Sequence, residues 1–364
     1  MERKEAEGGV KSNPVRKEYI DFLKIIAIYM VLFIHTSTKG SLIFIQKPFA
    51  VQSYFYLFFG IIVKIAVPLF FMSSGALLLG KTEDYKTVIK KRFLRFLVTL
   101  ILASLINYLY ICFRSSPKPF SLVAFIESMY KTPVSVALWY LYAFLAYILM
   151  LPLLRKMVRS LEGKDYKWIF AMYALIQFLS IAEYLIWHGK ITHNGNFNLF
   201  VSLSYVFYPL MGYYIDQKMD DSAFTRKNVL ILWILGILGT VLSCLMTYHK
   251  CIYINEWKTS SCQTFFNTFS FMPAFAAFFT AKYFFMKHKP GKKLSKVLKT
   301  LSSLTLGIFI LEWICRRETE FIYKALEPHI HSFPACLIWI FCACVAGGVV
   351  VFIIKKIPVL RRYF

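Results

Sequence analysis

The chain consists of apolar blocks of about 20 residues that alternate with short basic loops. Of its 364 residues 58% are hydrophobic, and the mean hydropathy is +0.56. A helix of about 20 residues crosses a hydrocarbon core of ~30 Å, and soluble proteins of this length carry many more charges. The sequence therefore predicts an all-α integral membrane protein. Ten spans are expected, at approximately 19–38, 56–79, 96–113, 136–154, 168–187, 198–215, 229–248, 264–286, 301–315 and 335–354.

The distribution of basic residues predicts the topology. The net charge is +24, and most of the 43 Lys and Arg fall in every second loop, starting with the N-terminal segment. The positive-inside rule then places both termini in the cytoplasm, and the basic loops suit anionic lipids or an anionic cytosolic ligand rather than nucleic acid. We expect a cytoplasmic tail at 1–18, one membrane domain at 19–354 and a cytoplasmic tail at 355–364. No cleavable signal peptide is expected, because the first residues are polar.

The first span carries three ionisable residues, Asp21, Lys24 and His35. Such groups are costly at bilayer depth and usually face a protein interior or a wet cavity. Eleven residues separate Lys24 from His35, which places them ~20° apart around a helix and roughly 16 Å apart along it. Asp21 lies within ~40° of the same line. One stripe therefore presents an acid, a base and an imidazole, which favours a functional role over a snorkelling lysine and an incidental histidine.

Two further groups of residues have a possible site role and a simpler alternative. Arg92 and Arg95 are three residues apart and share a helix face, where they could grip phosphate or only anchor the topology. Trp139 and Tyr142 lie near the outer interface, where they could form a platform for a sugar ring or part of an aromatic belt. Glu183, near the outer end of the fifth span, is a further candidate on the acceptor side.

Glu312 lies within the ninth span among apolar neighbours. A carboxylate there must pair or take up a proton. His35 or Lys24 would make it part of a site, whereas Arg316, four residues later, would make it a structural ion pair.

Small residues and cysteines mark two other features. Pro68, followed by Ser73, Ser74 and Gly75, could kink the second span and open a cavity opposite the first helix, or serve ordinary helix packing. Cys251 and Cys262 bracket one outer loop, which is compatible with a disulfide or with two free thiols. No spacing typical of a metal site is present, so no metal is expected.

These motifs resemble a known family. The chain resembles the membrane-bound acyltransferase-3 family over nearly its whole length, most closely the O-acetyltransferases of enterobacterial common antigen type. The resemblance rests on segments that look like family landmarks: YIDFLKIIAIYMVLFIHT, VPLFFMSSG, RFLR, WYLY, YPLMGYYI and LGIFILE. Two positions depart from the family pattern, which often has Arg where Lys24 stands and usually His where Glu312 stands.

The resemblance implies an acetyl-CoA-dependent O-acyltransferase of the bacterial plasma membrane. Its acceptor would be a cell-envelope polysaccharide or a lipid-linked glycan. His35 would be the general base, and Lys24 would contact CoA or stabilise the developing oxyanion, with Asp21 orienting it. Arg92 and Arg95 would hold the anionic end of CoA. The competing hypothesis is a transporter or flippase for a glycan or a small anionic metabolite, because buried charges also line proton-coupled paths.

Overall fold

The computed structural model describes residues 16–115, 119–188 and 203–364, and in these ranges the chain is helical and contains no strand. The α-helices of the membrane region are α1 (Glu18–Ile34), α2 (Val51–Ile62), α3 (Ala66–Leu78), α5 (Leu94–Tyr110), α7 (Trp139–Ser160), α8 (Gly163–Trp187), α9 (Ser204–Tyr213), α10 (Arg226–Tyr253), α12 (Phe271–Lys287), α13 (Lys292–Glu318) and α15 (Ser332–Ile354). The shorter ones are α4 (Tyr85–Thr87), α6 (Leu122–Lys131), α11 (Thr259–Cys262) and α14 (Glu320–Leu326).

Several of these helices form a bundle long enough for a membrane. Seven helical segments of the described chain are long and apolar enough to cross a bilayer: Val51–Leu78, Tyr85–Arg114, Val136–Ser160, Gly163–Trp187, Arg226–Tyr253, Lys292–Glu318 and Ser332–Ile354. The other three predicted spans correspond to the shorter helices α1, α9 and α12, so the count of ten is not confirmed. The chain is thus a multi-pass helical protein, and the cytoplasmic location of its termini stays a prediction.

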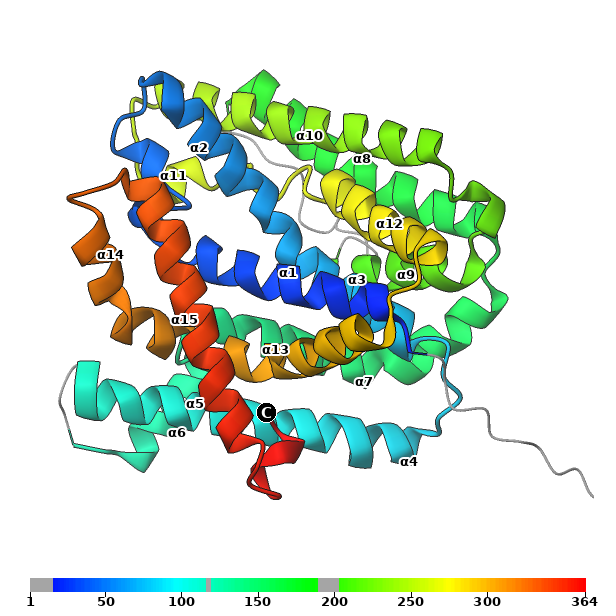
Figure 1. Cartoon of the computed structure of the whole chain (residues 1–364). Coiled ribbons are helices and arrows are strands. Elements are labelled where there is room, and N and C mark those ends of the chain that lie inside the picture. The colour runs from blue at the N-terminus through cyan, green and yellow to red at the C-terminus, as the bar shows by residue number, and fades with distance from the viewer. Residues whose placement is uncertain (1–15, 116–118, 189–202) are drawn as a thin grey trace, which may run out of the picture.

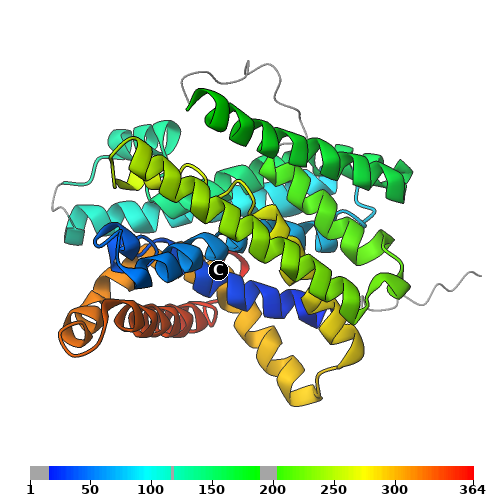
Figure 2. The same ribbon diagram turned by 90° about the horizontal axis from the view of Figure 1, so that it is seen from above.

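Helix α1 lies inside the bundle. It packs against α3, α12, α13 and α15, and Figure 2 shows α8 and α15 on opposite sides of it. This position explains how a helix with Asp21 and Lys24 is tolerated, because its polar groups face other helices rather than lipid. In Figure 1, α1 runs through the centre of the bundle, so that its two ends point to opposite ends of the molecule.

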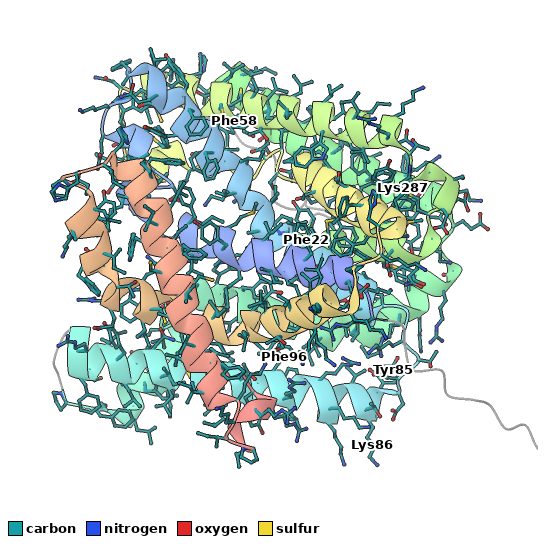
Figure 3. The ribbon with its side chains drawn as sticks, in the orientation of Figure 1. Phe22, Phe58, Tyr85, Lys86, Phe96 and Lys287 are labelled. Carbon is teal, nitrogen blue, oxygen red and sulfur yellow. The ribbon has the colours of Figure 1, made fainter. Side chains whose placement is uncertain are left out.

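The outer surface of the bundle is largely apolar. Phe22 is 38% exposed, and large aliphatic and aromatic side chains project from the outer faces of α8, α10 and α15. Lys86 and Lys287 lie toward the end of the bundle at which α1 begins, as Figure 3 shows. An apolar outer surface, with lysines near one end of the bundle, is the arrangement expected of a membrane-spanning protein.

Helices α3 and α9 cross at glycine contacts. A Cβ atom on Gly75 would overlap the backbone of Pro209, and one on Gly212 would overlap the backbone of Met72. Small residues allow membrane helices to approach closely, because packing rather than the hydrophobic effect holds them together in lipid. Gly75 therefore serves helix packing, which is one of the two alternatives that the sequence left open for this segment.

Replacing Gly75 with alanine is expected to destabilise the folded protein by about 1–3 kcal/mol, because the backbones of α3 and α9 must separate. Thermal unfolding of purified protein in detergent measures the effect. Gly163→Ala is the matched control, since a Cβ there meets nothing within 4 Å. Equal melting temperatures for both variants would contradict a close crossing.

The C-terminal segment and one pair of cysteines each make close contacts in the fold. Residues 355–364, which we expect to be a cytoplasmic tail, pack against the helices: Arg95 donates a hydrogen bond to the carbonyl of Arg362 at 2.7 Å, and Phe364 is only 5% exposed. Cys251 and Cys262 are buried, and their sulfurs lie 2.8 Å apart. The fold therefore brings the two cysteines together, and the choice between a disulfide and two free thiols stays open.

Candidate active site

His35 stands at the C-terminal end of α1, where the chain turns sharply. Thr36 accepts a hydrogen bond from the backbone N–H of Ser41 at 3.1 Å, and the Ser41 hydroxyl donates to the carbonyl of Ile34 at 2.9 Å. Ser37 has a φ of 53° within this turn. These local bonds satisfy polar groups that the helix end leaves free, and they hold the imidazole at one position.

Glu312 pairs with His35 and Arg316 at the same time. Its Oε1 lies 3.3 Å from Nδ1 of His35, and its Oε2 accepts a hydrogen bond from Nε of Arg316 at 2.7 Å. The carboxylate is 2% exposed. Nδ1 of His35 is buried and makes no hydrogen bond within the described residues, so its 3.3 Å approach to Glu312 is an electrostatic contact. Two of the three partners that the sequence left open for Glu312, His35 and Arg316, are thus present, and no ion pair joins Glu312 to Lys24 in the described ranges.

Arg316 also bonds to the backbone of the site. Its Nη1 donates to the carbonyl of His35 at 2.7 Å. That carbonyl belongs to the last turn of α1, where acceptors lack partners in the helix and a positive charge is favourable. Arg316 therefore fixes both the carboxylate beside the imidazole and the backbone that carries it.

A cavity of about 450 Å³ opens beside His35. Its described wall includes Lys64, Pro68, Trp139, Tyr208 and Asn267. A mixture of aromatic faces with amide and hydroxyl groups is typical of a site for a polar small molecule. Hereafter we call it the His35 cavity. A cavity beside Pro68, which the sequence left as an alternative to ordinary helix packing, is thus present, and Trp139 lines it. Lys64 was not singled out by its sequence context.

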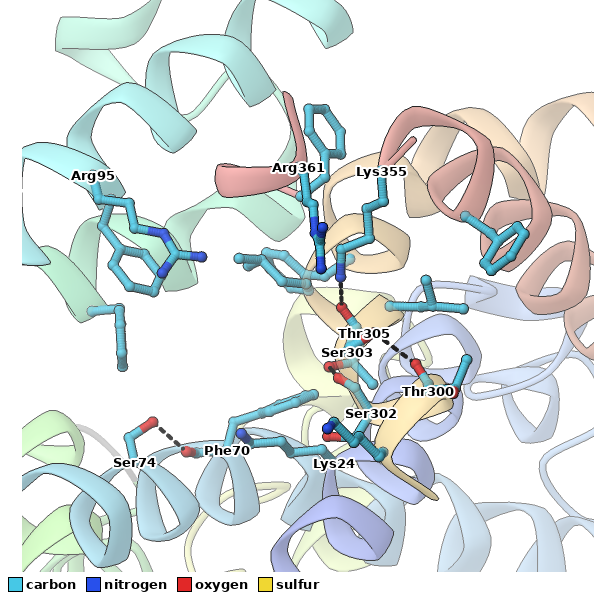
Figure 4. A pocket seen from close by; sticks show the side chains of 18 of the residues that line it. Lys24, Phe70, Ser74, Arg95, Thr300, Ser302, Ser303, Thr305, Lys355 and Arg361 are labelled. Carbon is cyan, nitrogen blue, oxygen red and sulfur yellow. Dashed lines mark hydrogen bonds between the residues drawn. The ribbon is translucent and has the colours of Figure 1, made fainter. Parts of the chain in front are cut away.

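A second cavity, of about 830 Å³, lies toward the start of α1 and is strongly basic. The basic residues that line it come from α1, α5, α13 and the C-terminal segment: Lys24, Arg95, Lys296, Lys299, Lys355, Lys356 and Arg361. No aspartate or glutamate side chain is found among its described lining residues. Figure 4 shows Lys24, Arg95, Lys355 and Arg361 reaching into the same space from different elements. Hereafter we call it the basic cavity, and its field favours a polyanion.

The two cavities share part of their walls. Tyr140 and Phe309 line both, and their ring centroids are 5.5 Å apart in an edge-to-face arrangement. These two rings thus form a wall that is common to the basic cavity and the His35 cavity.

Three other predicted site residues, Asp21, Tyr142 and Glu183, do not belong to the described wall of either cavity. Asp21 accepts hydrogen bonds from Arg16 at 2.6 Å and Ser302 at 2.7 Å, and no direct bond to Lys24 is present among the described residues. Tyr142 donates to the carbonyl of Met129 at 2.9 Å. Glu183 is buried in α8 at 6% exposure.

Arg92 and Arg95 are separated by the fold. Arg95 lines the basic cavity, whereas Arg92 forms an ion pair with Glu83. Glu83 also accepts a bond from the buried Arg155 at 3.0 Å. The hydrogen bonds from Arg92 and Arg155 lower the pKa of the Glu83 carboxyl to about 2, although its partial burial opposes this shift. Arg92 thus stabilises the segment before α5 through its ion pair with Glu83.

Glu83→Gln is expected to lower the melting temperature at neutral pH, because two arginines lose their counter-charge. A carboxyl with a depressed pKa stabilises the folded state above its ordinary pKa of 4.5, and this contribution is lost as the pH falls toward about 2. The difference between wild type and variant should therefore shrink between these two pH values. Thermal unfolding across this range tests it, and a constant difference would contradict the assignment.

Comparison with known proteins adds the decisive observation. The sequence model of acyltransferase family 3, described as an acyltransferase domain, matches residues 17–355. The chain belongs to the acyltransferase-3 family. It is a membrane acyltransferase in the general sense that this family defines. No curated protein and no solved structure gave a match.

Within this acyltransferase, sequence reasoning missed most of the basic cavity. Lys296 and Lys299 lie three residues apart on α13, and Lys355, Lys356 and Arg361 come from the segment expected to be a tail. The only available signal was the abundance of lysine and arginine in these loops, and this signal is the same for a topology anchor.

Proposed function

We propose that the acyltransferase moves an acetyl group from acetyl-CoA to a hydroxyl of a cell-envelope glycan, in the plasma membrane of a bacterium. The observation that supports the proposal is the pair of adjoining cavities, one basic and one lined by His35, which share Tyr140 and Phe309. The proposed donor has a polyanionic nucleotide end and a long neutral arm. The nucleotide end suits the basic cavity, and the arm would pass Tyr140 and Phe309.

The chemistry follows from the His35–Glu312 pair. With Nδ1 of His35 directed at Glu312, Nε2 is the nitrogen left to act as a base. It would take the proton of the acceptor hydroxyl while that oxygen attacks the thioester carbonyl. The tetrahedral intermediate would collapse by breaking the C–S bond, and the CoA thiolate would recover the proton from His35. Glu312 would hold the imidazole in the required tautomer and stabilise its charged form.

Lys24 would act on the donor. It lines the basic cavity together with Ser302 and Arg95, so its ammonium would contact the phosphates or the pantetheine arm of CoA. The acceptor would occupy the His35 cavity against Trp139. The narrower relationship to the enterobacterial common antigen branch stays a prediction from the sequence motifs.

A reconstitution assay tests this function. Purified protein in lipid nanodiscs is supplied with radiolabelled acetyl-CoA, with and without envelope glycan from the native cell. Label that reaches the glycan only in the presence of the protein supports the proposal. Glycan or metabolite flux in sealed vesicles without consumption of acetyl-CoA would instead favour the transporter hypothesis, against which membership of an acyltransferase family already argues.

A further inference from the structure

Lys64 is a lysine at the middle of a membrane-spanning segment. It occupies a short 3₁₀ turn, Val63–Ile65, between α2 and α3. Val51 and Leu78, the ends of this segment, are each roughly 20 Å away along the helix axis. The distance is too long for a lysine stem to bring its ammonium to either interface, so snorkelling does not explain this residue.

The ammonium of Lys64 has no counter-charge in the described structure. No ion pair joins it to a carboxylate in the described ranges, and its recorded partner is the ring of Phe266, whose centroid lies 5.6 Å from Nζ. A charge in a low-dielectric region without a partner is costly. Lys64 nevertheless lines the His35 cavity, where a ligand could supply the missing negative charge.

The rest of the cavity wall suits a sugar. Trp139 and Tyr140 offer aromatic faces, and Gln263, Asn267 and Ser270 carry amide or hydroxyl groups. No aspartate or glutamate belongs to the described wall, so nothing there neutralises Lys64 or repels an anion. The donor's phosphates are accounted for by the separate basic cavity.

We propose that Lys64 binds an anionic group of the acceptor, so that the acyltransferase acts on an acidic sugar bearing a carboxylate or phosphate rather than on a neutral one. This inference rests on the proposed function and adds the class of acceptor to it. An ammonium that is paired only when the acidic sugar is bound favours that sugar over a neutral analogue, which would leave the charge unpaired.

The acylated sugar in the native cell gives the first test. Envelope glycan from cells with the wild-type chain and from cells with His35→Ala is hydrolysed under conditions that preserve esters and analysed by mass spectrometry. An acyl group on an acidic sugar, absent in the variant, supports the inference. An acyl group on a neutral sugar overturns it while leaving the proposed function intact, and the absence of any chain-dependent acyl sugar removes both.

Binding by purified full-length protein gives the second test. Glucuronic acid and glucose are titrated in nanodiscs, with tryptophan fluorescence as readout because Trp139 lines the cavity. We expect wild type to bind glucuronic acid about tenfold more tightly than glucose, which corresponds to about 1.4 kcal/mol. Lys64→Met should abolish this preference and Lys64→Arg should retain it, whereas the exposed Lys47→Met should change nothing. Equal wild-type affinities, no glucuronic acid binding, or a preference that survives Lys64→Met would overturn the inference.

A donor comparison separates the two possible sources of the negative charge. If Lys64 contacts the acceptor, Lys64→Met leaves the relative affinities for acetyl-CoA and succinyl-CoA as they are in wild type. A selective loss of succinyl-CoA binding would show that Lys64 contacts a carboxylate on the acyl group, and would overturn the inference.

Discussion

Replacing His35 with alanine is expected to reduce acyl transfer by about 10²–10⁴-fold, the range typical of a lost general base. The reason is geometric as well as chemical: His35 is the imidazole that faces the cavity while a buried carboxylate lies at its Nδ1. Transfer of radiolabel from acetyl-CoA to envelope glycan measures the loss. Acetyl-CoA affinity should stay near the wild-type value, because the basic cavity is unchanged.

The controls for this prediction separate chemistry from folding. His329→Ala removes an exposed histidine and should leave transfer unchanged. Glu312→Gln keeps the shape of the side chain but removes the charge beside the imidazole, so we expect a smaller loss and a changed pH profile of the rate. Wild-type transfer by a correctly inserted His35→Ala protein would refute the role of His35 as the base.

The second large effect concerns the basic cavity. Arg95→Met combined with Arg361→Met is expected to weaken acetyl-CoA binding by roughly 10- to 100-fold, because each lost charge-assisted hydrogen bond contributes about 1.5–3 kcal/mol and the other lysines compensate in part. Isothermal titration at two salt concentrations measures it, and the variant should show a weaker salt dependence. The affinity of dephospho-CoA should fall less if the two arginines hold the 3′-phosphate.

Arg92→Met provides the matched control for this experiment. Arg92 belongs to the same RFLR motif as Arg95, yet its guanidinium is paired with Glu83 outside the basic cavity. The substitution should therefore lower the melting temperature and leave acetyl-CoA affinity within about twofold of wild type. If Arg92→Met weakened binding as much as the double variant, the motif rather than the cavity would hold the donor.

Predictability from sequence differed between local and long-range features of the site. The stripe on α1 follows from helical periodicity, so the alignment of Lys24 with His35 was predictable from their spacing. Each now lines a different cavity, and the two cavities meet at Tyr140 and Phe309. No periodicity relates α1 to the helices that carry these rings, and their meeting point could not be predicted.

Pairing of charges was the least predictable feature. Glu312 had several candidate partners, and the fold lets it bind two of them because α1 and α13 pack side by side. Arg92 and Arg95 share a helix face in the sequence pattern. In the fold, however, Arg92 forms an ion pair with Glu83, whereas Arg95 lines the basic cavity. Such choices depend on which opposite charges come within reach after the helices have packed.

The sequence by itself determined that the chain is a multi-pass helical protein, because blocks of about 20 apolar residues are stable in a bilayer only when every backbone group bonds within its own helix. It also determined that α1 carries an ionisable stripe, because that relation involves one helix alone. Only the tertiary structure decided which charges pair, which basic residues surround one cavity, and that Lys64 faces the other. These are contacts between segments distant in sequence, and close packing of the helices selects among partners that the sequence leaves equivalent.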